Sequence, residues 1–313
     1  MKKILLFGEP LVLLTTTTIT SLDEADSFKK SLAGAEVNVA IGLTRLNHQA
    51  TYLTVLGDDP WGHYIKNKLY LEGIDTSLVY YDQMHPTGMM MKNQVSQGDP
   101  DIYYYRQGSA FSNFDVDIIE QIDLSSFDQL HLTGIPLALS AKTREASLKL
   151  VKKARQMGLY ISYDPNLRPT LWPDAKTMIE TTNEMAQYCD MFLPGNNEGK
   201  ILMGSDDPDV ISDYYLNLGV KELVIKLGAQ GAYYANQKTS FTTPGFKVDK
   251  IIDTVGAGDG FASGIISGHL EGLSNEEMLQ RGNAIGAIQV QTLGDNEGLP
   301  TPKQLAAYLK KTV

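Results

Sequence analysis

Short apolar runs alternate with longer segments of helical spacing along most of this chain. Two of the longer segments, 141–157 and 175–188, place apolar side chains at the period of a helix, and Gly158 follows the first as a stop. Strands that alternate with helices predict an α/β protein whose parallel sheet is covered by helices. Ligands of such sheets bind beyond the carboxyl ends of the strands. The predicted buried strands are 4–7, 129–132, 159–163, 191–193 and 223–227.

Two regions do not follow this alternation. Residues 11–30 contain four consecutive threonines and then a polar turn. Farther along, 88–95 and 102–106 have the composition of two strands, and Gln-Gly-Asp-Pro at 97–100 is a strong turn signal between them. We expect these segments to form a small accessory sheet that lies over the strand ends as a lid.

The chain is expected to form one domain over residues 1–313, with lid strands from about 11–32 and 86–108, because no linker or repeat interrupts it. Its formal charge of −10 argues against nucleic acid as a partner, since binding a phosphate backbone needs a basic surface. Cys189 is the only cysteine, which suits a reducing cytoplasm. No apolar run is long enough to span a membrane.

Residues 253–261 read Asp-Thr-Val-Gly-Ala-Gly-Asp-Gly-Phe. Gly256, Ala257 and Gly258 would let the backbone approach an anion closely, and a helix that starts here would aim free N–H groups at it. Asp259 lies within this cradle and is placed to accept a proton. The pattern suggests phosphoryl transfer to a hydroxyl group, and a glycine-rich turn with a capping aspartate is the alternative.

Two familiar phosphate-binding motifs do not describe this loop. The chain has no Gly-x-x-x-x-Gly-Lys-Ser/Thr, the signature of P-loop proteins. The dinucleotide fingerprint is also incomplete, because Phe261 stands where its third glycine would be. The helix predicted over 257–270 nevertheless puts the positive end of its dipole at the loop.

A second candidate ligand segment is Ala-Gly-Ala-Glu-Val-Asn-Val-Ala at 33–40. Gly34 and Asn38 are four residues apart at a predicted helix start, so their exposed groups would meet on one face, open to the hydroxyls of a ligand. Helix entry with an asparagine cap is the alternative. The turn Gly-Asp-Asp-Pro-Trp-Gly at 57–62 follows a strand-like run and leads into another helix.

Taken together, 34–40 with the 57–62 turn, and 253–259 near the C-terminus, resemble the two signatures of the PfkB (ribokinase-like) carbohydrate kinases in order and spacing. The resemblance covers nearly the whole chain. It implies a ribokinase-like three-layer α/β/α sandwich with a mainly parallel central sheet and a small β lid. It also implies transfer of the ATP γ-phosphate to a sugar hydroxyl, with Asp259 as catalytic base and residues 256–258 as anion hole.

Further matches to this family suggest residues for the nucleotide. The segment Lys226-Leu-Gly228-Ala-Gln-Gly231 follows a strand, as the nucleotide-binding segment of the family does, although an ordinary strand-to-hairpin turn would look the same. Asn283 falls where the family often borders the adenine, and a polar residue on a helix face is the alternative.

The resemblance also suggests a residue for Mg²⁺. Glu198 matches the acid of an Asn-x-x-Glu element that the family ties to magnesium and phosphate. The asparagine position of that element is Gly195 here, which is a departure from the pattern. An exposed helix carboxylate is the alternative for Glu198.

Two arginines point to the kind of sugar. In a strand of period two, Tyr104 and Arg106 would face the same side, and Arg168 lies just past the carboxyl end of a predicted strand. Arginine is suited to bidentate recognition of a carboxylate, which a sugar acid has and a neutral sugar lacks. Structural ion pairs or stacking on tyrosines are the alternative for each arginine.

Within the family, these segments look like those of the 2-keto-3-deoxygluconate kinases, which hold the sugar acid with the matching Tyr and Arg residues and face it with the residue matching Gly34. Ser109-Ala110 and Asp-Pro-Asn-Leu-Arg-Pro at 164–169 contribute to the likeness. One departure is Met90, where many relatives place a ligand-facing tyrosine. Fructokinases also carry an Asp-Pro-Asn-x-Arg segment.

Three functions therefore stand side by side. The first is a kinase that uses ATP and Mg²⁺ to phosphorylate 2-dehydro-3-deoxy-D-gluconate at its distal hydroxyl. The second is a fructokinase or other neutral-sugar kinase of the same fold, and the third is a non-catalytic ligand sensor, which loss of Asp259 or the glycines would have signalled. An exposed lid edge is also expected to allow a homodimer or higher homo-oligomer.

Overall fold

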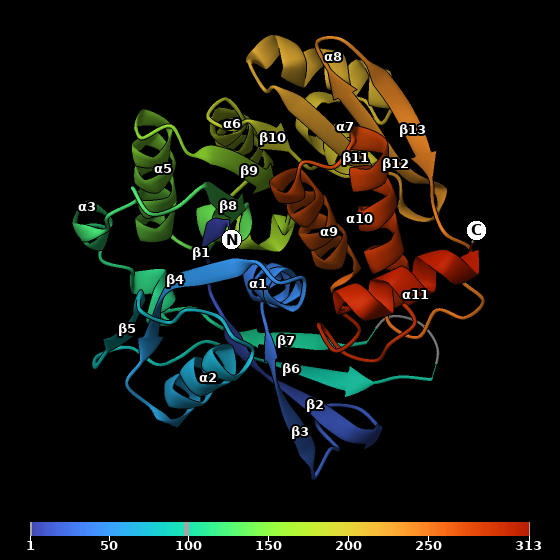
Figure 1. Ribbon diagram of the computed structural model, residues 1–313. Helices are drawn as coiled ribbons and strands as arrows, with labels where there is room; N and C mark the ends of the chain where they lie inside the picture. The colour runs from blue at the N-terminus through green and yellow to red at the C-terminus, as the bar shows by residue number, and fades with distance from the viewer. Residues whose placement is uncertain (1, 97–99, 313) are drawn as a thin grey trace.

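A large twisted sheet forms the centre of the molecule, and a smaller sheet lies at one side of it (Figure 1). The computed structural model describes residues 2–96 and 100–312. Within these residues the large sheet has nine strands in the order β13-β12-β11-β10-β9-β8-β1-β4-β5. Its strands are β1 (Lys3–Phe7), β4 (Gln49–Gly57), β5 (Val79–Asp82), β8 (Gln129–Thr133), β9 (Tyr160–Asp164), β10 (Met191–Phe192), β11 (Glu222–Lys226), β12 (Gly231–Asn236) and β13 (Ser240–Pro244).

From β11 through β5 all neighbouring strands pair in parallel, and β12 and β13 add an antiparallel hairpin at one edge. This confirms the mainly parallel sheet. The five predicted buried strands correspond to β1, β8, β9, β10 and β11. Successive residues of a strand point to opposite faces, so Leu5 and Phe7 join one core while Ile4 and Leu6 join another.

Helices cover both faces of the large sheet, which gives the predicted three layers. One core contains side chains of α3 (Ile118–Gln121), α4 (Ile135–Leu139), α5 (Ala141–Gln156), α6 (Ala175–Ala186), α7 (Asn196–Met203) and α8 (Pro208–Leu218). The other contains side chains of α1 (Ala35–Arg45), α2 (Pro60–Leu71), α9 (Ala257–Glu271), α10 (Asn275–Gln289) and α11 (Pro302–Thr312). No helix in the described part of the chain is long and apolar enough to cross a bilayer.

The lid is a four-stranded sheet in the order β3-β2-β6-β7. Its strands are β2 (Leu11–Ile19), β3 (Phe28–Ala33), β6 (Met89–Gln94) and β7 (Ile102–Tyr105). The first two follow β1 directly and the other two follow β5, so both halves leave the large sheet at carboxyl strand ends. The predicted lid is confirmed, while residues 97–99 of the predicted turn lie outside the described residues.

Candidate active site

A cavity of about 420 Å³ lies where the carboxyl ends of the central strands meet the lid. It unites residues from the lid, from α1, from the loop after β9, from the end of β11 and from the start of α9. The sequence places two of these residues, Gly34 and Asp259, 225 positions apart. The predicted site residues that line it are Gly34, Asn38, Met90, Tyr104, Arg106, Arg168, Glu198, Lys226, Gly256, Gly258 and Asp259.

The glycine-rich loop ends at Gly256, and α9 begins at Ala257. Gly256 has a φ of +76°, and a Cβ at this position would collide with the carbonyl oxygen of Asp295, so only glycine fits. A Cβ on Gly258 would meet no protein atom within 4 Å, because this glycine faces open space. Gly256 and Gly258 therefore bring the positive end of the helix dipole to the cavity without side-chain cover. This geometry suits a phosphate group.

Asp259 lies in the first turn of α9 and is held by two amides. The Nδ2 of Asn38 donates to its Oδ2 at 2.8 Å, and the Nδ2 of Asn166 approaches Oδ1 at 3.4 Å. Burial raises the pKa of Asp259 to about 7, with repulsion from the carboxylate of Asp164 adding to the shift and the Asn38 hydrogen bond opposing it. A carboxyl group with this pKa is suited to accept a proton near neutral pH.

Gly34 and Asn38 both line the cavity, and they occupy different positions in α1. Gly34 caps α1 with a φ of +137°, and a Cβ there would come within 2.9 Å of the carbonyl oxygen of Glu9. Asn38 lies inside the helix and does not cap it. Its side chain accepts a hydrogen bond from Asn296 at 3.0 Å and donates one to Asp259, so it orients the carboxylate.

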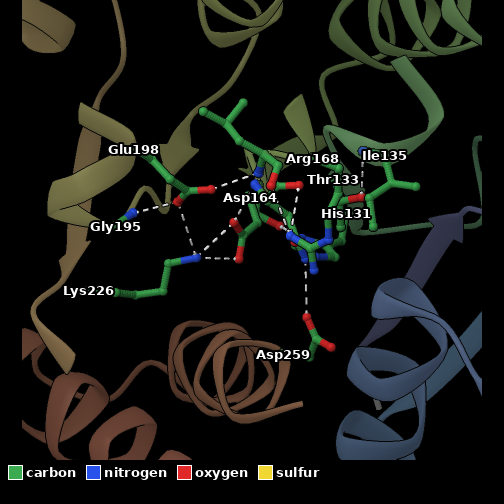
Figure 2. Close-up of polar contacts among 12 residues, drawn as sticks. His131, Thr133, Ile135, Asp164, Arg168, Gly195, Glu198, Lys226 and Asp259 are labelled. Atoms are coloured by element: carbon green, nitrogen blue, oxygen red, sulfur yellow. Dashed lines mark hydrogen bonds and ion pairs between the residues drawn. The ribbon is translucent and has the colours of Figure 1, made fainter. Parts of the chain in front are cut away.

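A charged cluster occupies the carboxyl ends of β9, β10 and β11. Figure 2 shows the Lys226 ammonium between the carboxylates of Asp164 and Glu198. Its Nζ contacts the two Asp164 oxygens at 2.8 and 2.7 Å, and Glu198 Oε2 at 3.9 Å. Burial alone would lower the pKa of Lys226, but the two carboxylates raise it above its ordinary value. Lys226, predicted for the nucleotide, is thus a charged residue of the cavity wall.

Glu198 is fixed by backbone amides on both sides. Its Oε2 accepts from the N–H of Gly195 at 2.7 Å, and its Oε1 accepts from the N–H of Leu167 at 2.8 Å (Figure 2). These bonds orient the carboxylate while Glu198 still lines the cavity. They also tie the loop after β9 to the start of α7.

The cavity suits a Mg²⁺ ion that arrives with a nucleotide. Such an ion is held by one or two carboxylates, by waters and by the phosphates themselves. Among the described residues no group of three or more His, Cys, Asp or Glu side chains would hold a metal by itself. Glu198 and Asp164 both line the cavity, and each carboxylate oxygen retains acceptor capacity beyond its present bonds.

The lid contributes Arg106, Tyr104 and Met90. Arg106 is buried, and its Nε and Nη2 contact Glu9 Oε2 at 2.7 and 2.6 Å, while Ser109 donates to the other Glu9 oxygen. The guanidinium carbon lies 5.7 Å from the centre of the Tyr104 ring. Both the ion pair and the stacking considered for this arginine are therefore present. Arg106 also lines the cavity, so the pair with Glu9 fixes the guanidinium at the ligand space.

Arg168 is less constrained than Arg106. It is exposed, it follows β9 by four residues, and its Nη1 donates to the carbonyl oxygen of Leu167 at 3.0 Å. No ion pair of Arg168 occurs among the residues that the structure describes. Met90 is paired in register with Tyr104 across β6 and β7, and its side chain is buried.

Three residues predicted for the nucleotide lie away from the lining of this cavity. Gly228 belongs to the short turn after β11, where a Cβ would meet nothing within 4 Å. Gly231 starts β12 with a φ of +107° and packs against the backbone of Thr243. Asn283 donates to the carbonyl oxygens of Thr243 and Pro244, at 3.2 and 3.1 Å. Their nucleotide roles remain predictions.

Several lining residues were not singled out from the sequence. Glu36 lies between Gly34 and Asn38; burial raises its pKa to about 7, and the Thr133 hydroxyl donates to it. Asp164 and Asn166 belong to the Asp-Pro-Asn segment that drew attention only to its arginine. An acid inside an apolar helix start was the signal for Glu36. Ile135 of α4 had no signal of this kind.

The comparisons with known proteins agree with this architecture. The chain matches the model of the pfkB family carbohydrate kinases over residues 1–302 and belongs to that family. In a crystal structure of a PfkB protein from Polaromonas sp. JS666, the fold is similar with a TM-score of 0.90 and 41% sequence identity, over 98% of this chain and 100% of that chain. The ribokinase-like fold and the family expected from the two motifs are confirmed.

Curated relatives of the chain are sugar kinases. A 2-dehydro-3-deoxygluconokinase of Bacillus subtilis (strain 168) is 44% identical over 304 residues, 97% of this chain and 94% of the relative. One of the same name from Thermoproteus tenax is 34% identical over 306 residues, covering 97% and 93%. Fructokinase-2 of Solanum lycopersicum is more distant, at 31% over 320 residues, covering 97% and 95%.

Proposed function

We propose that this protein phosphorylates 2-dehydro-3-deoxy-D-gluconate at its distal hydroxyl, using ATP and giving the 6-phosphate and ADP. The observation that carries the proposal is one cavity with Arg106 and Arg168 in its wall and Asp259 beside the start of α9. Cations suit the carboxylate of a sugar acid, while the base and the helix start suit its far hydroxyl and a phosphoryl group. The more similar curated relatives bear the name of this activity.

The sugar would bind with its carboxylate toward the two arginines. Arg106 is held in place by Glu9, and Arg168 has donors that are free to turn toward a ligand. Two positively charged donor groups would fix one end of the sugar, so that its distal hydroxyl lies near Asp259. Met90, Tyr104 and Gly34 would form the remaining contact surface of this subsite.

The transfer would then need one proton acceptor and one charge stabiliser. The hydroxyl oxygen forms a bond to the γ-phosphorus as the bond from that phosphorus to the bridging oxygen of ADP breaks, and the hydroxyl proton passes to Asp259. N–H groups at Gly256, Ala257 and Gly258 would stabilise the charge on the phosphoryl oxygens. Asn38 and Asn166 keep the carboxylate of Asp259 aimed.

The nucleotide would bind at the side of the cavity where Lys226 lies. Lys226 lies in the cavity wall beside Asp164 and Glu198. The other residues predicted for the nucleotide lie in the turn after β11, at the start of β12 and on α10 against β13; they are Gly228, Gly231 and Asn283. Glu198, assisted by Asp164, would hold Mg²⁺ through water and phosphate oxygens. When bound, that ion supplies positive charge to the β- and γ-phosphates. A cytoplasmic location remains a prediction.

An ADP-release assay with ATP and a panel of sugars tests the proposal. The panel contains 2-keto-3-deoxygluconate, fructose, ribose and gluconate. We expect the first to give the highest kcat/KM, and Asp259→Asn to bind it while losing turnover by about 10²–10⁴-fold, the range for a general base. Preference for fructose would establish the neutral-sugar alternative, and no turnover with any sugar would favour the sensor.

A neutral-sugar kinase remains the second candidate because of one contact. The Nε and Nη2 of Arg106 are already engaged by Glu9, so this guanidinium has fewer donors left for a sugar carboxylate. If the Glu9 pair satisfies Arg106 completely, replacing Arg106 would alter folding and leave sugar preference unchanged. Competition between 2-keto-3-deoxygluconate and fructose in the wild-type protein separates these readings directly.

A further inference from the structure

Lys92 of the lid is a buried lysine with no place in the mechanism above. It lies on β6 two residues after Met90, so both side chains point to the face of the lid that meets the large sheet. Only 5% of Lys92 is exposed. Its Nζ contacts Asp253 Oδ2 at 2.7 Å and lies 3.8 Å from Asp295 Oδ1. A lysine this deeply buried is rare unless it is paired.

Both carboxylates belong to the framework of the anion hole. Asp253 accepts from the N–H of Val255 at 3.1 Å and from the N–H of Gly294 at 3.3 Å, so it joins the loop before α9 to the loop after α10. The backbone of Asp295 packs directly against Gly256. The Lys92 ammonium therefore lies against the two loops that set where Gly256 and Gly258 point.

The same loops also reach the proposed base. Asn296 follows Asp295 and donates to Asn38 at 3.0 Å, and Asn38 donates to Asp259 at 2.8 Å. A continuous series of polar contacts thus runs from the lid through residues 294–296 to both parts of the phosphoryl-transfer site. Within the described residues, no other lysine or arginine of the lid sheet forms an ion pair with these loops.

We propose that Lys92 is a positioning residue, an internal cation that couples the lid to the anion-hole loop. This rests on the proposed function, since it assigns Lys92 a role in the same phosphoryl transfer. With the ammonium in place, the repulsion between Asp253 and Asp295 is offset and the two loops are held together. Burial raises the pKa of Asp295 to about 6, with Lys92 opposing the rise, as expected for a carboxylate that needs this cation.

The variant Lys92→Met tests the role, because it keeps the length of the side chain and removes the charge. We expect kcat for sugar phosphorylation to fall about 10–100-fold, which is equal to or smaller than the fall caused by removing one oxyanion-hole donor. The KM for the sugar should change by no more than about threefold. Lys92→Arg should retain most of the activity. Lys29→Met on β3, an exposed lid lysine, is the matched control and should leave kcat unchanged.

Restoring the activity of Lys92→Met with small cations distinguishes a positioning role of Lys92 from a role in stability alone. The space vacated by the ammonium lies between two carboxylates, so about 100 mM ammonium or potassium should restore much of the lost kcat in Lys92→Met. Tetramethylammonium, which is too large to enter, should not. Activity is normalised to the folded fraction measured by circular dichroism. Unchanged kcat per folded molecule, or equal rescue by tetramethylammonium, would overturn the proposal.

Hydrogen exchange provides a readout that does not need turnover. In Lys92→Met without substrates, peptides covering 253–258 and 294–296 should exchange faster than in the wild type, and ammonium should reverse the change. If the wild type phosphorylates no sugar, the proposed function fails while this measurement still tests the link between lid and loop. Unaltered exchange in both peptides would refute the link even in an active kinase.

Discussion

The proton acceptor proposed for this site has a pKa near neutrality. Burial raises the pKa of Asp259 to about 7, and a base must be deprotonated to act. We therefore expect kcat to fall about tenfold per pH unit below pH 7 and to level off above it. The measurement is kcat at saturating substrates from pH 5.5 to 8.5, on enzyme shown to stay folded throughout.

The hydrogen bond from Asn38 favours the charged form of Asp259 and so opposes this rise in pKa. In Asn38→Leu the inflection should therefore move to higher pH, and kcat at pH 6 should fall more than kcat at pH 8.5. A wild-type kcat that is flat between pH 5.5 and 7 would contradict the assignment of Asp259.

The choice between sugar acid and neutral sugar depends on individual arginines, and Arg168 gives the cleaner test because it has no structural ion pair within the described residues. Arg168→Gln should raise the KM for 2-keto-3-deoxygluconate about 10–100-fold, the effect of losing charge-assisted hydrogen bonds. The KM for ATP should stay within about twofold as the internal control. An unchanged sugar KM would leave the sugar-acid proposal without its main contact.

Residues that act through local backbone geometry were predictable from the sequence. Gly256 has the left-handed conformation that a glycine allows, and Asp259 follows within the same turn, so a single segment of the sequence predicts where both residues lie. Partners at long range were not predictable. Lys226 and Asp164 are 62 residues apart, and Asn296 and Asn38 are 258 apart, so only the folded sheet brings them together. Arg106 was foreseen as a ligand residue, but nothing local pointed to its pair with Glu9.

At the scale of elements, the site depends on how closely α9 lies against α10. A Cβ on Gly264 would come within 2.7 Å of the Cα of Gly282, a backbone atom that cannot move aside. Gly264→Ala should therefore lower the free energy of unfolding by about 1–3 kcal/mol, as overpacking does. Urea unfolding followed by circular dichroism measures the change.

Gly286 of α10 is the matched control for this substitution. Its added Cβ would meet Ala257 O at 3.4 Å and Phe261 Cβ at 3.8 Å, which are ordinary contacts. Gly286→Ala should therefore be neutral or add up to about 1 kcal/mol through helix propensity. If Gly264→Ala left the free energy of unfolding unchanged, the two helices would tolerate a larger separation. Their close approach would then not contribute to stability.

Elements with strong periodicity were predicted well, and edge elements were not. The helices over 141–157 and 175–188 appear as α5 and α6 with ends shifted by one or two residues. The hairpin of β12 and β13 was recognised only as a possible turn. β13 is the edge strand and alternates between exposed and half-buried positions, whereas β12 is buried over most of its length. β7 is also an edge strand, and three of its four residues are exposed.

At the scale of the whole molecule, the lid sheet has an exposed edge at β7. β7 is the last strand of that sheet. Its residues Tyr103 and Tyr105 are 64% and 55% exposed, with ring centres 6.1 Å apart. An open strand edge with an aromatic patch favours pairing with a second copy. We expect light scattering after gel filtration at about 10 µM to give twice the 34.5 kDa chain mass.

Charges introduced on this face test whether the lid makes the contact. The double variant Tyr103→Lys/Tyr105→Lys should elute with the mass of one chain, because like charges on both copies repel across a symmetric interface. Tyr70→Lys, at a 70% exposed site of α2 close to the amino ends of β1 and β4, is the control and should keep the wild-type mass. A wild type of 34.5 kDa at this concentration, or a double variant that stays dimeric, would contradict pairing through β7. Since Tyr104 lies between the two substituted residues and lines the cavity, a dimeric lid would also join two active sites through one continuous sheet.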